Sequence, residues 1–193
     1  MIPDTVVFDL ETQNFFSDPE VGWFNYEALR ISALGVYSYA RGEYFCFEES
    51  ELPEAADLFR ASRLLVGFSS NRYDVPVLNR YFQKLDPPLN LFHKERLDLL
   101  DEIELVTGRR VSLGRLAEAN LGEGKSGHGS DAARLFREGK LEELKSYCLK
   151  DVELTRRLYE QYRDRKFFLI PNRETGENER VEFLRNLFAD ASA

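Results

Sequence analysis

Residues 5–12 read Thr-Val-Val-Phe-Asp-Leu-Glu-Thr, an apolar, β-rich run that ends in two carboxylates. Its first six residues have the length and composition of a buried central strand. Side chains two positions apart on a strand point to the same side, so Asp9 and Glu11 are predicted to face one point in space. A carboxylate that ends an apolar strand is costly unless something compensates its charge, and a divalent cation would do so. The alternative is a strand end that meets solvent, and the pair alone does not decide between them.

The segments that follow alternate between strand and helix patterns. Residues 31–39 and 43–47 flank the turn-forming Ala40-Arg41-Gly42 and are predicted to form a hairpin, and residues 63–68 (RLLVGF) are predicted to form another buried strand. Helical spacing of apolar residues predicts helices over residues 53–61, 74–82, 112–120, 131–138 and 141–165. This order predicts an α/β layered fold in a single domain over residues 1–193, with a second, smaller hairpin at 166–184.

Two later segments carry further candidate site residues. Asp74 opens the helix that follows the strand at 63–68, and ligand sites in α/β sheets form at such strand ends. Asp74 could instead simply cap that helix. Tyr147 and Asp151 lie four positions apart on a strongly helical segment, so they share one face. Asp151 falls near the apolar side of this helix, where an isolated charge is unfavourable, and a compensating partner is therefore expected. The alternative is a buried tyrosine with an aspartate hydrogen-bonded nearby.

Taken in order, D-x-E on the first strand, an Asp that opens a helix, and Y-x-x-x-D on a late helix resemble the DEDD exonuclease superfamily. The chain is most similar to the tyrosine branch, because Ser146 stands where the histidine branch has its histidine. It also resembles predicted 3′–5′ exonucleases related to the proofreading domain of B-family DNA polymerases. The resemblance extends over residues 6–158, although Ser69 stands where the family often has Asn.

The resemblance implies a ribonuclease H-like fold, in which a mixed central sheet has helices on both faces. It implies a metal-dependent 3′–5′ exonuclease that acts on DNA or RNA with two Mg²⁺ or Mn²⁺ ions. Asp9, Glu11 and Asp151 would bind the first ion. Asp9 would bridge to the second, supported by Asp74, and Tyr147 would orient the attacking water. Two alternatives stay open: a non-catalytic nucleic-acid-binding module of a larger complex, and an endonuclease that uses the same metals.

The overall charge argues against a protein that coats nucleic acid electrostatically. The net charge is −8 and the pI is near 5.0. Bound cations can reverse the local sign at an acidic site, and positive charge is grouped locally, for example at Arg109-Arg110. The expected partner is a nucleic-acid substrate, with a polymerase or helicase as a further candidate.

Cysteine content and hydropathy predict a cytoplasmic protein with no membrane segment. Cys46 and Cys148 are the only cysteines in the sequence, too few for a disulfide framework, and no apolar run is long enough to span a bilayer. Aromatic residues are dense over residues 15–26, directly after the first carboxylates. They could stack on unpaired bases or fold into the core.

Overall fold

The computed structural model describes residues 4–124, 129–172 and 175–183. Within these ranges, one mixed sheet has five strands in the order β3-β2-β1-β4-β5. The strands are β1 (Asp4–Thr12), β2 (Ile31–Ser38), β3 (Glu43–Phe47), β4 (Ser62–Gly67) and β5 (Glu95–Asp98). The central strand β1 is antiparallel to β2 and parallel to β4, and β4 is parallel to β5. The carboxyl ends of β1, β4 and β5 therefore meet at one edge of the sheet, where ligand sites of α/β proteins form.

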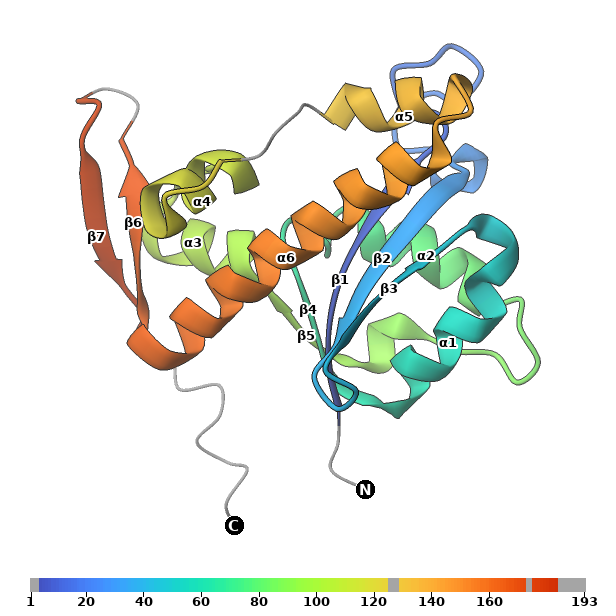
Figure 1. The fold of residues 1–193 in the computed structure, drawn as a ribbon, viewed down its shortest axis with the longest axis horizontal. Coiled ribbons are helices and arrows are strands. Elements are labelled where there is room, and N and C mark those ends of the chain that lie inside the picture. The colour runs from blue at the N-terminus through green and yellow to red at the C-terminus, as the bar shows by residue number, and fades with distance from the viewer. Residues whose placement is uncertain (1–3, 125–128, 173–174, 184–193) are drawn as a thin grey trace.

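Helices cover both faces of this sheet. They are α1 (Leu52–Ala61), α2 (Asp74–Phe82), α3 (Leu99–Thr107), α4 (Leu113–Leu121), α5 (Gly129–Arg137) and α6 (Leu141–Arg165). Val6 and Phe8 of β1 pack with α1 and α2, whereas Val7 packs with α3, α4 and α6. Alternation along the strand places Asp9 and Glu11 on the same face as Val7, which α6 crosses in Figure 1. The predicted α/β fold with helices on both faces is confirmed.

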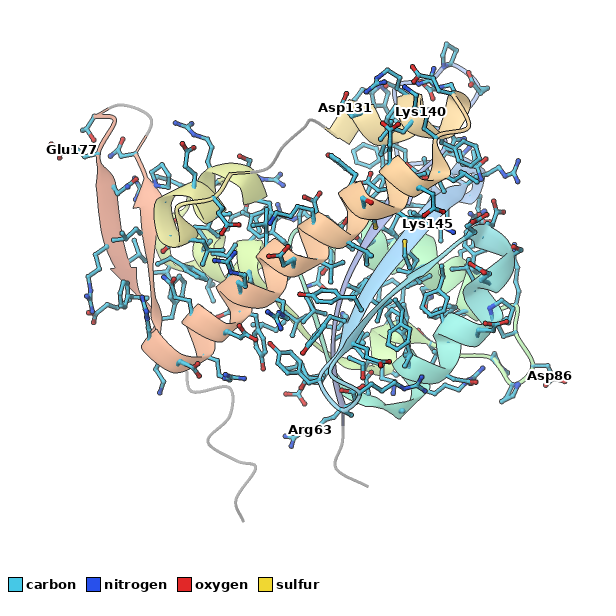
Figure 2. The ribbon with its side chains drawn as sticks, in the orientation of Figure 1. Arg63, Asp86, Asp131, Lys140, Lys145 and Glu177 are labelled. Atoms are coloured by element: carbon cyan, nitrogen blue, oxygen red, sulfur yellow. The ribbon has the colours of Figure 1, made fainter. Side chains whose placement is uncertain are left out.

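A glycine lets α6 approach the sheet closely. Gly35 on β2 is paired with Asp9 on β1. A Cβ atom at Gly35 would lie only 2.8 Å from Val152 Cγ2 and 3.0 Å from Cys148 Sγ. Closer to the start of α6, Lys145 (labelled in Figure 2) forms an ion pair of 2.6 Å with Glu48, the residue that follows β3. The helix is therefore held close to β2 and the end of β3, and β2 is the direct neighbour of the strand that carries Asp9 and Glu11.

The C-terminal hairpin forms a sheet of its own. Strands β6 (Phe167–Pro171) and β7 (Asn178–Glu182) are antiparallel and lie within the range 166–184 predicted for a hairpin; residues 173–174 and 184 of that range lie outside the described residues. Its residues Phe168 and Ile170 join the core formed with α4 and α6. Figure 1 shows the hairpin beyond α4, on the opposite side of the molecule from α1.

The sequence patterns did not predict β5 and α3. The strand has only four residues, Glu-Arg-Leu-Asp, and three of them are charged, so neither length nor hydrophobicity indicates a strand. Pairing with β4 stabilises it nevertheless. None of the described helices is long and apolar enough to cross a membrane. The division into one domain stays a prediction.

Candidate metal centre

Three of the predicted carboxylates lie together at the end of the central strand. Asp9 and Glu11 come from β1 and Asp151 comes from α6, and one carboxylate oxygen of each lies within 4.8 Å of those of the others. Asp151 is only 2% exposed. Because α6 crosses the face to which Asp9 and Glu11 point, residues about 140 positions apart in sequence converge here. The geometry agrees with the predicted placement, and the catalytic role of these residues stays a prediction.

The fourth carboxylate, Asp74, is the first residue of α2 and is tied to β1. Its side chain accepts a hydrogen bond of 2.9 Å from the backbone N–H of Leu10. Burial, the largest influence, raises the pKa of Asp74 to about 7, although that hydrogen bond lowers it; the charges of Asp98 and Asp151 raise it further. The N-cap of α2 is Tyr73, so Asp74 is not the helix cap, and its carboxylate reaches the strand between Asp9 and Glu11.

Asp9, Glu11 and Asp151 repel one another when they are ionised, and a bound cation would relieve this repulsion. Two like charges about 4.8 Å apart interact unfavourably by about 3–4 kcal/mol at an effective dielectric constant of about 20. The donors are all oxygen atoms, which Mg²⁺ and Mn²⁺ prefer and which are a poor set for zinc. The residues present thus fit one or more divalent cations of this kind.

Asp98, at the end of β5, supports the site without joining it; β5 is separated from β1 by β4. Asp98 caps α3, accepting hydrogen bonds from the backbone N–H groups of Leu100 at 3.0 Å and Asp101 at 3.3 Å. It also accepts hydrogen bonds from the backbone N–H groups of Ser69 at 2.8 Å and Asn71 at 2.9 Å. These contacts fix the loop that leads into Asp74, and Ser69 in this loop adopts a left-handed conformation with φ of 61°. Such backbone strain is often found beside functional sites.

Tyr147 lies on the same helix as Asp151 but lines a neighbouring cavity. It lies one turn before Asp151 on α6, as predicted, and is half-buried. It lines a cavity between α5 and α6 with Leu135 and Ser146, and it packs against the cluster that contains Ala132. It does not line the cavities formed by Asp9 and Asp151 in the described part of the chain. The water-orienting role therefore stays a prediction.

An open cavity of about 610 Å³ lies beside the acidic residues. Besides its polar residues it has an aromatic wall. The carboxylates that line it are Asp9, Glu11, Asp74 and Asp151, and the aromatic residues are Phe15, Phe16, Trp23 and Tyr73. This wall comes from the loop after β1 and from the start of α2, so aromatic rings and carboxylates share one opening.

The aromatic segment after β1 is divided between core and surface. The ring of Phe16 packs edge-on against Tyr26 and Tyr73, with centroids 5.0 and 5.6 Å away. In contrast, Trp23 is 74% exposed and Phe24 is 77% exposed. Some rings of this segment therefore fold inward and others are exposed, and stacking of the exposed rings on unpaired bases stays a prediction.

A mixed sheet in this order, with helices on both faces and acidic residues at the end of its central strand, defines the ribonuclease H-like class of α/β proteins. The family model of the RNase H superfamily matches residues 6–163, and the chain belongs to this superfamily.

Among solved structures, the family B DNA polymerase from the hyperthermophilic archaeon Pyrobaculum calidifontis is similar, with a TM-score of 0.65 and 18% sequence identity. The match covers 84% of this chain and 25% of that chain, so this protein spans about a quarter of the polymerase. At this identity the similarity shows the shared fold. No curated protein sequence matches.

Proposed function

We propose that this protein is a metal-dependent 3′–5′ exonuclease that hydrolyses phosphodiester bonds at single-stranded 3′ ends of nucleic acid. The observation that supports this most is the convergence of Asp9, Glu11 and Asp151 within 4.8 Å, beside an open cavity that Asp74 also lines. Hydrolysis of a phosphodiester requires an activated water and stabilisation of charge on the attacking and leaving oxygens. Two divalent ions, when bound about 3.5–4 Å apart, supply both.

Each residue has a role in this proposal. Asp9, Glu11 and Asp151 would hold one ion, and Asp9 and Asp74 the second. Since the pKa of Asp74 is about 7, its carboxyl must give up a proton when it supports a cation below that pH. Tyr147 would orient the attacking water by a hydrogen bond, because a phenol with an ordinary pKa of about 10 is a poor base at neutral pH.

The aromatic wall supports the choice of a single-stranded end. Stacking on aromatic rings binds unpaired bases of any sequence, and Trp23 and Phe15 line the cavity that holds the four carboxylates. A terminal nucleotide whose base stacks there would have its phosphodiester beside the acidic cluster. A binding module without activity would gain nothing from burying Asp151 next to two other carboxylates, and this favours an enzyme.

A cleavage assay separates the candidate functions. Linear and circular single strands of matched sequence, as DNA and as RNA, are incubated with Mn²⁺ after the linear strands are labelled at the 5′ end. We expect the linear strand to shorten one nucleotide at a time while the circle stays intact. Cleavage of the circle would indicate an endonuclease, and binding without any cleavage would indicate a non-catalytic module.

Substitutions assign the activity to the acidic cluster. Asp9→Asn and Asp151→Asn are each expected to abolish hydrolysis while far-UV circular dichroism stays that of the parent. Asp57→Asn is the matched control, because Asp57 is an exposed residue of α1, which packs on the face opposite to α6. Undiminished cleavage by both variants in the cluster would overturn the assignment.

A further inference from the structure

A second cavity adjoins the acidic cluster. It measures about 860 Å³ and shares Asp9, Ser69 and Asp151 with the aromatic cavity. Its remaining wall comes from the loop between α3 and α4 and from the end of β6, where Ile170 and Asn172 line it. A substrate bond held at Asp9 and Asp151 would therefore lie where the two cavities meet.

The two cavities differ in charge. Arg109 and Arg110 line the second one, whereas the described residues that line the aromatic cavity include no Lys or Arg. In a chain with a net charge of −8, two adjacent arginines thus stand in the wall of a cavity that opens at an acidic cluster. Arginine binds phosphate groups through pairs of parallel hydrogen bonds.

Both guanidinium groups are held in place by glutamates. Arg109 pairs with Glu179 of β7 at 2.5 Å, and Arg110 pairs with Glu104 of α3 at 3.0 Å. A simpler interpretation of the Arg109–Glu179 ion pair is purely structural: it would only hold the hairpin against the α3–α4 loop. However, a guanidinium has five N–H donors, and one carboxylate cannot use them all. Arg109 and Arg110 remain 38% and 60% exposed, so donors stay accessible.

We propose that this arginine cavity binds the sugar–phosphate backbone of a single strand on the 5′ side of the scissile bond, with the β6–β7 hairpin as its outer wall. The proposal rests on the proposed function, because that function places the 3′-terminal nucleotide in the aromatic cavity and leaves the arginine cavity for the rest of the strand. A cavity of about 860 Å³ has the size of a small-ligand site and accommodates only a few nucleotides of one strand. The hairpin has no role in the metal centre, and in this proposal its role is to help bind the substrate strand.

The test compares a substrate that reaches the arginine cavity with one that does not. The first is a labelled 12-nucleotide single strand. The second is the p-nitrophenyl ester of thymidine 5′-phosphate, in which nitrophenol replaces the strand on the 5′ side. For the variant Arg109→Ala/Arg110→Ala we expect KM for the 12-mer to rise on the order of tenfold, with hydrolysis of the nitrophenyl ester unchanged. Arg115→Ala, an exposed arginine of α4 that does not line the cavity, should behave as the parent does.

Binding is measured separately from cleavage. Fluorescence anisotropy of the 12-mer is followed in the Asp151→Asn background with Mg²⁺ at several salt concentrations. Loss of two phosphate contacts should reduce the slope of log affinity against log salt by about 1.4. Affinity and slope that are unchanged in the double arginine variant would overturn the proposal. A parent enzyme that binds in this arginine-dependent way but hydrolyses neither substrate would overturn the proposed function instead and leave the binding site standing.

One further variant separates phosphate binding from fastening of the hairpin. Glu179→Gln breaks the ion pair but keeps Arg109. If Arg109 binds phosphate, this variant should bind the 12-mer as tightly as the parent or more tightly, because the guanidinium is released from a competing carboxylate. If Glu179→Gln weakens binding as much as Arg109→Ala does, Arg109 only holds the hairpin in place and does not bind phosphate, and the proposal is wrong.

Discussion

Replacement of Gly35 by alanine tests whether the close approach of α6 positions the metal centre. The new Cβ would lie 2.8 Å from Val152 Cγ2, about 0.7 Å short of the 3.5 Å at which carbon–carbon contact becomes favourable. The contact with Cys148 Sγ at 3.0 Å is also too short. Val152 is β-branched and has one strongly preferred rotamer in a helix, so the strain is expected to move α6 rather than the side chain.

The expected cost to stability follows from overpacking. Extra methyl groups in a well-packed core destabilise a protein by about 1–3 kcal/mol. The lower entropy of the unfolded chain with alanine offsets about 0.4–1 kcal/mol of that. Urea unfolding of the metal-free protein should therefore show a net loss on the order of 1–2 kcal/mol, with an unchanged m-value.

The metal centre should be affected more than the fold. A metal ligand tolerates displacements of about 0.2 Å, whereas α6 must move Asp151 by several tenths of an ångström relative to Asp9, the strand partner of Gly35. We expect Mn²⁺ affinity, measured by titration calorimetry, to fall on the order of tenfold. The double variant Gly35→Ala/Val152→Ala should recover part of the affinity, because it removes the closer of the two contacts. If Gly35→Ala is within 0.5 kcal/mol of the parent and binds Mn²⁺ equally well, the close approach of α6 does not set the geometry of the site.

Three further predictions concern individual side chains. The pKa of Asp74 is about 7 in the folded protein and 3.8 ordinarily, so the free energy of unfolding of the metal-free protein should fall as pH rises from about 4 to 7. In urea unfolding with EDTA, the variant Asp74→Asn should not show this fall. Tyr147→Phe should keep the parent's Mn²⁺ affinity and lower kcat, and equal rates at saturating Mn²⁺ would remove Tyr147 from the mechanism. Asp98→Ala removes the cap of α3 and the acceptor of the Ser69 and Asn71 backbone amides. It should therefore destabilise the protein by about 2–3 kcal/mol and weaken Mn²⁺ binding. A loss of less than about 1 kcal/mol in urea unfolding would contradict this.

The elements that could be predicted from sequence are those with a strong local pattern. β1 has a β-rich apolar run, α6 has 25 residues of helical spacing, and Gly42 supplies the positive φ that the β2–β3 turn requires. The convergence of Asp9 with Asp151 is not a local property. It could be expected only because the order of motifs resembles a known family, and the geometry of β1 and α6 agrees with that expectation.

What could not be predicted depends on contacts between distant segments. The strand β5 is stabilised by β4 rather than by its own composition. The position of Tyr147 in a cavity beneath α5 follows from how α5 packs on α6, which no spacing along α6 encodes. The arginine cavity was missed for the same reason. The Arg109-Arg110 pair was visible as a local concentration of charge, but nothing in the sequence placed it opposite the end of β6.

The C-terminal hairpin is fixed strongly enough to serve as a wall. The side chain of Asn120 on α4 donates a hydrogen bond to the carbonyl oxygen of Leu169 and accepts one from its N–H, each at 2.8 Å, so it pairs with β6 as a neighbouring strand would. Gln161 of α6 donates to the same Asn120 side chain at 2.8 Å. Because the helix that carries Asp151 also holds this network, the position of the hairpin is coupled to that of the metal centre. The helix α6 thus positions both Asp151 and the hairpin, which line the arginine cavity together. A strand bound against the hairpin would therefore be held at a defined distance from the acidic cluster.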